Sequence, residues 1–255
     1  LNKNNRLYLS IYNGRDGLGF NANSQGTSGK WGNTVASLKW NTIVNPRLFL
    51  NTIVTYSLFR YTIEDFRQVI DQDGVTNTES YKGNSTIKDL AVNLQASWYA
   101  TSSQRFSIGT HLATATFTPT ELITTNTYNI AGKTIVPADK FQSNEFIFFA
   151  EDEVKINSRW IIRPGLHFAN WFSERFNYSS IQPRLYTSYK MAPSHSIYAS
   201  YGQMAQFLHL ISNNTYGLPT DFWLPSSDRI EPEESSLVTL GYTGKPVKNL
   251  WYNIE

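Results

Sequence analysis

The stretch that decides the fold is SIQPRLYTSYKMAPSHSIYASYG, residues 180 to 202. Apolar and polar residues alternate with a period of two on both sides of Ala192-Pro193-Ser194. This pattern is typical of two β-strands joined by a tight turn, because successive side chains of a strand point to opposite faces of a sheet. The apolar faces of these strands must cover either a protein core or the hydrocarbon of a lipid bilayer.

The composition excludes several classes of function. The 255 residues carry a net charge of only +2, and the basic residues are dispersed, which argues against nucleic-acid binding. Cysteine is absent, so disulfides and cysteine-ligated metal or redox sites are excluded. No run of about 18 apolar residues predicts a transmembrane helix. The start, LNKNNRLYLS, lacks a signal-peptide pattern, and we expect the chain to be an interior piece of a longer protein.

The periodicity predicts an all-β protein, because no segment keeps an apolar period of 3.6. We expect about 11 strands, at residues 6–16, 31–44, 46–66, 84–100, 105–118, 143–156, 158–174, 178–191, 195–207, 235–243 and 247–255. Several exceed the roughly 5 to 6 residues that are usual for strands in soluble sheets. A strand tilted by about 45° needs roughly 9 to 11 residues to cross a bilayer. The lengths therefore favour membrane-crossing strands.

The connections alternate between short and long. The short ones consist of turn residues, at 44–46, 101–104, 157–158, 192–194 and 244–246. The long ones cover 67–83, 119–142 and 208–234, with a short exception near 173–177; the glycine-containing stretch 14–19 is also interpreted as a loop. Tight turns at one rim and long loops at the other predict an antiparallel, up-and-down transmembrane β-barrel.

The two faces of the expected strands differ in polarity. We expect Leu38, Leu94, Leu185 and Ile197 to face lipid, and Lys39, Gln95 and Arg184 to line a wet interior. Large rings near strand ends on the apolar side predict an interfacial aromatic girdle, at Trp40, Trp98, Trp160 and Tyr189. A soluble β-sandwich would also alternate and remains the alternative.

Two features limit this interpretation. Pro164 and Pro183 each remove a hydrogen-bond donor within an expected strand, so we expect a bulge or a water-accessible position there. An odd number of strands does not match the even-numbered barrels of bacteria, and an open sheet would expose backbone groups to hydrocarbon. We therefore expect the strands to be part of a larger barrel.

Three stretches resemble the barrel of TonB-dependent outer-membrane receptors. In residues 198–245, Pro232, Glu233 and Ser235 precede Leu240-Gly241-Tyr242, which is similar to the family's P-E-x-S approach to an L-G-Y strand. IQPRLYTSYKM and FIFFAEDEVKINSRWIIRPGLHF are similar to two further strand motifs, although His167 stands where the family usually has Arg. The resemblance implies a 22-strand barrel with an N-terminal plug and a TonB box, neither of which is recognised in these residues.

The resemblance implies a function in nutrient uptake. Residues 1–255 are expected to form a partial receptor barrel in the outer membrane of a Gram-negative bacterium, taking up a glycan, a siderophore or a similar nutrient by TonB-coupled transport. The expected partners are the TonB complex acting through the plug, a small-molecule or oligosaccharide ligand, and membrane lipid including lipopolysaccharide; nucleic acid is not expected. We expect no enzyme activity and no cofactor. A plug-free porin or diffusion channel and a secreted β-sandwich carbohydrate-binding or adhesion module remain alternatives.

The candidate ligand-binding residues lie in the long connection at 203–230. Aromatic rings beside amides and charges are typical of sugar or siderophore recognition. The candidates are Gln206, His209, Asn213, Tyr216, Asp221, Trp223 and Arg229. The alternative is that Phe222 and Trp223 only anchor the loop on the rim.

One carboxylate pair has a spacing compatible with catalysis. Glu151 and Glu153 lie on one strand face with Cα atoms roughly 6.6 Å apart, as in inverting glycosidases. The alternative, which we favour, is that these carboxylates pair inside the barrel with Arg163, Lys155 or Arg184. The four histidines share no ligand spacing, so neither catalytic residues nor a metal site are expected.

Overall fold

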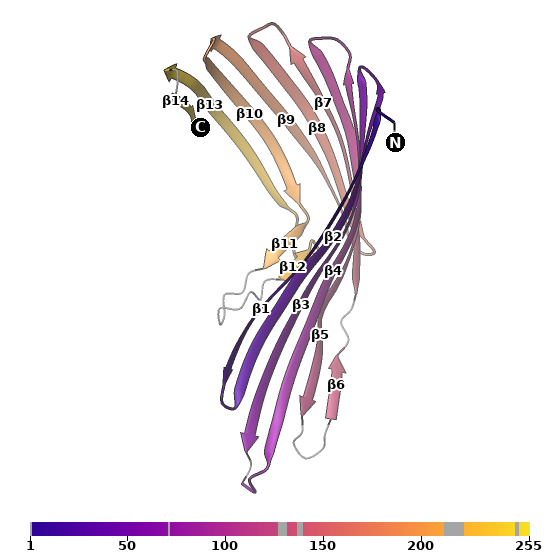
Figure 1. The fold of residues 1–255 in the computed structure, drawn as a ribbon, viewed down its shortest axis with the longest axis vertical. Helices are drawn as coiled ribbons and strands as arrows, with labels where there is room; N and C mark the ends of the chain where they lie inside the picture. Colours follow the sequence, from indigo (N-terminus) through magenta and orange to yellow (C-terminus); the bar gives the residue numbers. More distant parts are fainter. Residues whose placement is uncertain (1, 71, 127–131, 137–139, 212–221, 248–249) are drawn as a thin grey trace.

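The computed structural model describes residues 2–70, 72–126, 132–136, 140–211, 222–247 and 250–255. They form one curved antiparallel sheet and a separate two-stranded hairpin that lies on its concave side (Figure 1). The sheet follows sequence order, β1-β2-β3-β4-β5-β7-β8-β9-β10-β13-β14, and β6 pairs with β5 beside this path. The prediction of about 11 consecutive up-and-down strands is therefore confirmed.

The strands of the sheet are β1 Asn5–Ala22, β2 Gln25–Asn45, β3 Leu48–Ile70, β4 Thr76–Tyr99, β5 Gln104–Asn126, β6 Gly132–Val136, β7 Phe141–Lys155, β8 Trp160–Ser173, β9 Asn177–Ala192, β10 His195–Gln206, β13 Glu233–Val247 and β14 Leu250–Ile254. The hairpin consists of β11 Leu208–Ile211 and β12 Phe222–Pro225. β1 and β14 each pair on one side only, so the described sheet does not close. No described segment is a helix with the length and apolar character needed to span a membrane.

The first strands are longer than the sequence predicted. Residues 14–19, expected to be a loop, lie inside β1, and most of 67–83 belongs to β3 and β4, which are joined by residues 71–75. The chain between β1 and β2 turns at Asn23, whose φ of 45° is in the left-handed region that Asn tolerates. The expected loop at 119–142 likewise contains the end of β5, β6 and the start of β7.

Polar pairs join β3 and β4 where these extensions begin. The Thr62 hydroxyl donates to Asn84 Oδ1 at 3.0 Å, and Lys82 Nζ lies 2.5 Å from Glu64 Oε1. Because such segments lack the apolar alternation of a membrane-facing strand, the sequence pattern favoured a loop. The backbone ladder to neighbouring strands, which the pattern does not show, keeps them extended.

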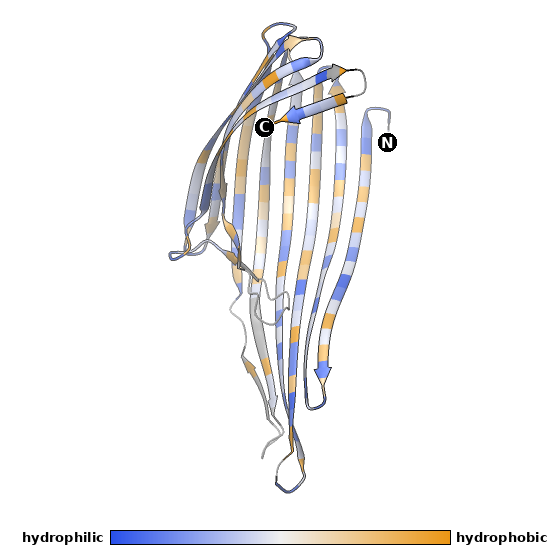
Figure 2. Cartoon of the chain, turned by 90° about the vertical axis from the view of Figure 1, so that its left-hand side faces the viewer, coloured by the Kyte–Doolittle hydropathy of each residue, from blue (hydrophilic) through white to orange (hydrophobic). Residues whose placement is uncertain are grey.

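The outer, convex face of the sheet is apolar. Leu38, Leu94, Leu185 and Ile197 are 42%, 42%, 46% and 40% exposed, and no described element covers them. Hydrophobic and hydrophilic residues alternate along the strands in Figure 2, as expected for a sheet with lipid on one side and water on the other. The predicted face assignment is confirmed, and the β-sandwich alternative is wrong because a sandwich would bury this face against a second sheet.

The predicted girdle residues also lie on the outer face. Trp40, Trp98, Trp160 and Tyr189 are all exposed. The indole nitrogen of Trp40 donates to Asn5 Oδ1 at 3.0 Å, and that of Trp160 donates to Thr187 Oγ1 at 2.9 Å. Rings that are apolar over most of their surface and hydrogen-bonded at one end suit the boundary between hydrocarbon and water.

The two strand prolines interrupt the ladder locally. The β7-β8 pairing has a gap between Gly165 and Ile162, which contains Pro164. The β9-β10 pairing ends at Arg184, next to Pro183. The sequence predicted a bulge or a water-accessible position. The β8-β9 register runs past both prolines without a shift. A gap in the β7-β8 pairing and the end of the β9-β10 pairing therefore stand where a bulge was one of the two expectations.

We expect an arginine in the middle of the outer face to destabilise the barrel. Leu94 lies between the girdle residue Trp98 and the polar end of β4, so Leu94→Arg should lower the free energy of unfolding by about 2 to 4 kcal/mol. The change is measured by denaturant titration in lipid, with heat-modifiable gel mobility as the assay for folded protein.

The matched control is Gln95→Arg, which introduces the same side chain on the inner face, one residue away. It should change the free energy of unfolding by less than about 0.5 kcal/mol. Equal destabilisation by both substitutions would contradict the assignment of the outer face to lipid.

Candidate ligand-binding sites on the inner face

An aromatic cluster joins the hairpin to the wall of the sheet. Trp171 on β8 is 4% exposed, and its ring centroid lies 6.3 Å from that of Phe207, nearly parallel to it. Phe141 of β7 stacks on the same indole at 6.2 Å, and Tyr178 of β9 lies 6.3 Å away. Because these residues share the inner face with Ala169, the cluster forms a small core inside the barrel wall.

Hydrogen bonds fix the hairpin in the same place. The Tyr178 hydroxyl donates to the carbonyl of Ser227 at 2.7 Å, and the amide of Ser226 donates to the carbonyl of Phe207 at 2.8 Å. The connection after β10 therefore does not extend away from the sheet. It folds back over the inner face, where it narrows the interior.

A deep recess of about 310 Å³ lies beside this cluster. Ala113, Ala115 and Ser143 occupy adjacent inner positions of β5 and β7, and their small side chains leave the space open. The recess is lined by two carboxylates, Asp89 and Glu145, and by aromatic surface of Trp171 and Phe207. Its chemistry combines hydrogen-bond acceptors with flat apolar walls.

His111 lies next to Glu145, one of the two carboxylates that line the recess. His111 Nδ1 lies 2.8 Å from Asn93 Oδ1, and its Nε2 lies 3.8 Å from Glu145 Oε2. Among the described residues, no group of three or more His, Asp or Glu side chains is arranged to hold a metal ion.

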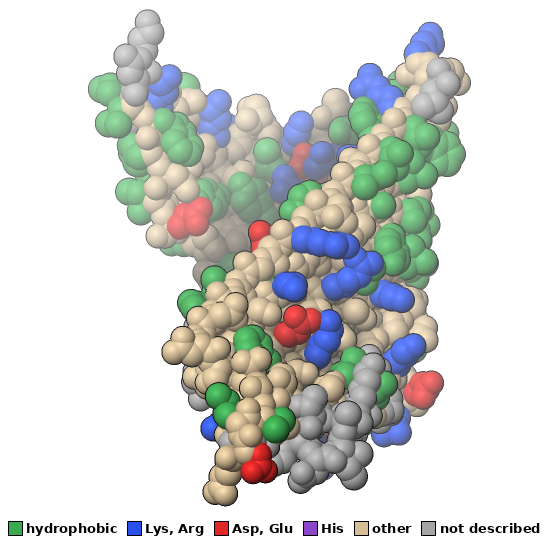
Figure 3. Space-filling model, turned by 60° about the horizontal axis from the view of Figure 1, so that its bottom comes forward, with side chains coloured by type: hydrophobic (Ala, Val, Ile, Leu, Met, Phe, Trp, Pro, Cys, Tyr) green, Lys and Arg blue, Asp and Glu red, His purple; other side chains and the backbone are tan. Residues whose placement is uncertain are grey.

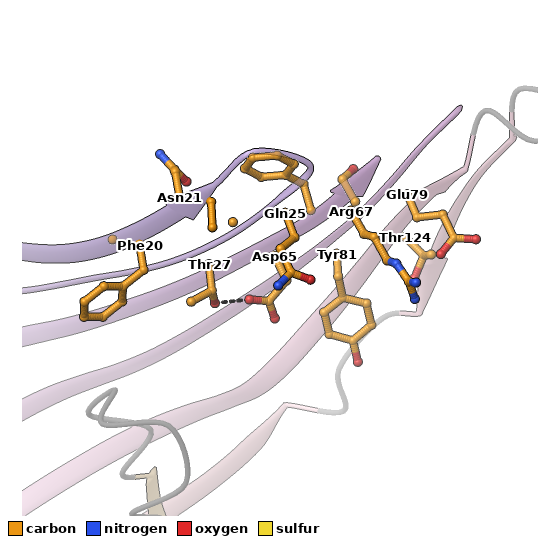
Figure 4. A pocket seen from close by; sticks show the side chains of 14 residues that line it. Phe20, Asn21, Gln25, Thr27, Asp65, Arg67, Glu79, Tyr81 and Thr124 are labelled. Carbon is orange, nitrogen blue, oxygen red and sulfur yellow. Dashed lines mark hydrogen bonds between the residues drawn. The ribbon is translucent and has the colours of Figure 1, made fainter. Parts of the chain in front are cut away.

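A second, larger recess of about 970 Å³ lies at the ends of β1 to β5 that are opposite the turns at 44–46 and 101–104. Its wall includes one row of paired residues on the inner face, Phe20, Thr27, Asp65, Tyr81 and Thr124, with Arg67 and Glu79 in the next row. Figure 4 shows Thr27 directed toward Asp65, to which it donates a hydrogen bond, with the phenol of Tyr81 beside them. This recess offers aromatic rings and charges of both signs.

The structure describes four of the seven residues that the sequence singled out, Gln206, His209, Trp223 and Arg229. Gln206 reaches the deep recess, and its side-chain amide donates to the carbonyl of Leu208. His209 is buried, with Nδ1 3.0 Å from Glu233 Oε1 and Nε2 3.0 Å from Ser226 Oγ. Both ring nitrogens thus have partners within the protein, which suits a residue that fixes the hairpin.

Of the other five candidate residues, the structure describes Trp223 and Arg229. Trp223 lies on β12 opposite Leu210, and Arg229 is exposed beyond the hairpin. Asn213, Tyr216 and Asp221 lie outside the described residues. Ligand contact by this set stays a prediction.

The Glu151 and Glu153 pair adopts the ion-paired arrangement. Glu153 Oε2 accepts hydrogen bonds from Arg163 at 2.6 Å and from Arg105 at 3.0 Å. Glu151 Oε1 lies 3.4 Å from His167 Nε2. Of the three expected cations Arg163 is a partner, whereas Arg105 and His167 come from strand neighbours that sequence spacing does not show. The arrangement gives these carboxylates a structural role.

Both recesses were missed by the sequence analysis. The larger recess combines residues of β1 to β5. The smaller one combines residues of β4, β5, β7, β8, β10 and the hairpin, which are distant in the chain. The available signal is the row of inner-face residues, for instance Phe20, Thr27, Asp65 and Tyr81. That row can be read only when the register between strands is known.

A comparison with protein families identifies the family of this chain. Residues 1–254 match the model of the TonB dependent receptor-like β-barrel. The chain belongs to this family. In a TonB-dependent receptor barrel the convex apolar face meets lipid and the concave face, with both recesses, lines the interior. No curated protein sequence matches the chain.

Solved structures agree with this family at the level of the fold. The chain is similar to the ferric preacinetobactin receptor BauA of Acinetobacter baumannii, with 11% identity, a TM-score of 0.61, and coverage of 96% of this chain and 43% of that one. It is similar to the copper transporter OprC, with 12% identity, a TM-score of 0.60, and coverage of 95% and 44%. The RagAB peptide transporter gives 7% identity, a TM-score of 0.58, and coverage of 87% and 29%. The chain thus spans less than half the length of each.

We expect Phe207→Ala to loosen the hairpin from the receptor wall. The substitution removes the ring that stacks on Trp171, and loss of a buried aromatic side chain costs about 3 to 5 kcal/mol. Hydrogen exchange of the backbone amides of β11 should become faster, while that of β4 and β5 stays unchanged.

Leu210→Ala is the control, because Leu210 lies on the same hairpin but is exposed. It should leave hydrogen exchange in β11 close to that of the unsubstituted protein. If Phe207→Ala also leaves it unchanged, the aromatic cluster does not hold the hairpin in place.

Proposed function

We propose that the protein is a receptor that takes up a nutrient across the outer membrane of a Gram-negative bacterium by TonB-coupled transport. Membership of the TonB-dependent receptor family supports this proposal. The residues described here supply a part of the barrel wall, within a 22-strand barrel as the family resemblance implies. In this proposal the barrel binds the nutrient and catalyses no covalent reaction.

The inner recesses support a proposal about the ligand. Asp89 and Glu145 accept hydrogen bonds or attract cations, and Trp171 and Phe207 offer flat apolar surface beside them. Sugars combine hydroxyl donors with apolar ring faces, so a glycan suits this recess. A ferric tris-catecholate siderophore carries negative charge, and two carboxylates would repel it. A neutral oligosaccharide is therefore the ligand class we propose.

In this proposal the two recesses bind the ligand in succession. The larger one lies at the ends of β1 to β5 that are remote from the turns at 44–46 and 101–104, and we place these ends on the extracellular side of the barrel. The deep recess lies farther in, beneath the hairpin. In this arrangement the first recess captures the ligand and the second, which Gln206 lines, holds it. The predicted ligand contacts of Asn213, Tyr216, Asp221, Trp223 and Arg229 also form part of this proposal.

The observation that carries the ligand proposal is the pairing of two carboxylates with aromatic walls in the deep recess. Its test is calorimetric titration of the purified protein with maltoheptaose, laminarihexaose and mannopentaose, and with a ferric tris-catecholate complex. We expect one of the neutral oligosaccharides to bind and the ferric complex not to bind. Asp89→Asn combined with Glu145→Gln should weaken oligosaccharide binding about tenfold or more, because hydrogen bonds to charged acceptors are lost.

The matched control is Asp152→Asn, the same chemical change on the outer face, where Asp152 accepts a hydrogen bond from Gln104 at 2.8 Å. Oligosaccharide affinity should be unaffected by this substitution. Binding of the ferric complex in place of all three oligosaccharides would overturn the proposed ligand class while leaving the receptor function intact.

A further inference from the structure

His209 is a buried polar side chain at the base of the hairpin, and it is only 6% exposed. Its ring nitrogens contact two segments that come later in the chain. Nδ1 lies 3.0 Å from Glu233 Oε1 at the start of β13, and Nε2 lies 3.0 Å from Ser226 Oγ just after β12. Because His209 itself belongs to β11, it joins three chain segments. We name these three residues, Ser226, His209 and Glu233, the His209 site.

The Ser226 hydroxyl donates its hydrogen elsewhere. Ser226 Oγ donates to the carbonyl oxygen of Phe207 at 3.1 Å, and the backbone amide of Ser226 donates to the same oxygen at 2.8 Å. A hydroxyl has one hydrogen to donate, so the Ser226 oxygen can only accept a hydrogen bond from His209. Nε2 of His209 therefore carries a hydrogen.

The other ring nitrogen of His209 also faces an acceptor. The Glu233 side chain is 66% exposed, and an ionised carboxylate accepts hydrogen bonds but donates none. Nδ1 therefore carries a hydrogen as well. An imidazole with hydrogens on both nitrogens is positively charged. The hydrogen bonds of the His209 site thus select the charged form of the histidine, with Glu233 as its counter-ion.

Loss of a proton costs the His209 site one hydrogen bond, whichever nitrogen the proton leaves. Without the hydrogen on Nδ1, a nitrogen lone pair faces the Glu233 carboxylate. Without the hydrogen on Nε2, the Ser226 hydroxyl must turn away from the Phe207 carbonyl to donate to His209. Histidine gains and loses its proton between about pH 5 and 8. The set of hydrogen bonds is therefore complete at low pH and becomes incomplete as the pH rises.

Glu233 is the one described residue that forms an ion pair with His209. Other titratable or charged side chains of the surrounding elements form neither a hydrogen bond nor an ion pair with it: Asp89, Glu145, Tyr178, Asp228, Arg229, Glu231 and Glu234. Lys and Arg side chains, which gather on the face shown in Figure 3, keep their charge throughout this pH range. The protonation of His209 therefore depends on its contact with Glu233.

The His209 site holds one wall of the deep recess. Phe207 and Leu208, which precede His209 in the chain, line that recess. The Phe207 carbonyl is bonded to Ser226, and the Phe207 ring stacks on Trp171 at 6.3 Å. A hydrogen bond lost at His209 therefore loosens the side of the recess that the hairpin provides.

We propose that His209 holds the hairpin over the deep recess only while both of its ring nitrogens are protonated. Deprotonation releases the hairpin, so a ligand in the recess is retained at low pH and leaves faster as the pH rises. His209 is a positioning residue, because it contacts the hairpin and its surroundings. The effect on the ligand rests on the proposed function, whereas the effect on the hairpin does not.

The first experiment needs no ligand. Hydrogen exchange of the full protein, purified in detergent, is measured by mass spectrometry at about pH 5.5 and about pH 7.5 and corrected for the intrinsic exchange rate at each pH. We expect the protection of the β11 amides to fall about tenfold at the higher pH, because a hydrogen bond to a charged group is lost. Protection of β4 and β5 should stay the same. Equal protection of β11 at both pH values would overturn the proposal.

Two variants assign the effect to the His209 site. His209→Gln introduces a side chain that does not titrate and should make the protection of β11 independent of pH. Glu233→Gln offers the neutral imidazole a donor in place of the carboxylate, so it should reduce the pH dependence. A pH dependence that persists unchanged in both variants contradicts the role of His209.

The matched control is His195→Gln, the same substitution at a histidine on the outer face of β10. Nδ1 of His195 lies 2.7 Å from the Tyr242 hydroxyl oxygen, away from the hairpin. This variant should keep the pH dependence of β11, and heat-modifiable mobility verifies that each variant is folded. Loss of the pH dependence in this control would point to a general effect of removing a histidine and would contradict the proposal.

The second experiment measures how fast the ligand leaves. The dissociation rate of maltoheptaose, laminarihexaose or mannopentaose, whichever binds, is compared at the two pH values. We expect about tenfold faster dissociation at about pH 7.5 and equal rates in His209→Gln, a comparison that also separates His209 from His111 beside Glu145. If β11 responds to pH but no oligosaccharide binds, the proposed ligand is wrong and the role of His209 stands. An oligosaccharide that binds but leaves equally fast at both pH values would show that the hairpin does not control the recess.

Discussion

The structure depends on the need to pair every backbone amide and carbonyl inside hydrocarbon. A group left unpaired there costs several kcal/mol, so a strand lies in hydrocarbon only when its backbone is hydrogen-bonded to neighbouring strands. Apart from β6, which lies beside β5, the described strands of the main sheet follow one another in chain order, and successive side chains of a strand point to opposite faces of the sheet. Binding sites on the inner face can vary without disturbing the ladder, because the ladder is made by the backbone.

The same pairing explains why β1 to β5 extend beyond the apolar band. Once the strands are aligned in the membrane, each further pair adds backbone hydrogen bonds without requiring apolar side chains. Polar contacts such as Thr62 with Asn84 then replace lipid contact. The extension creates one wall of the larger inner recess, which includes Asp65 and Tyr81.

The candidate sites were much harder to predict than the fold. The sequence singled out residues 203–230 as a candidate binding segment, yet its stacking contact joins Phe207, between β10 and β11, to Trp171 on β8, and no local pattern indicates this. His209 looked like a ligand residue, but burial and two partners give it a place in the hairpin. Asp89 and Glu145 gave no local signal, because they meet only when β4, β5 and β7 are aligned side by side.

The sequence by itself determined the strand faces. Alternation with period two follows from the geometry of a single strand, so Leu38, Leu94, Leu185 and Ile197 could be assigned to lipid without knowledge of their neighbours. Tertiary structure decided the register, the strand ends and the recesses. These depend on which residues face each other across strands, and a polar segment such as 14–19 is extended only because β2 pairs with it. Local patterns report the environment of one strand, whereas a site requires several strands in fixed alignment.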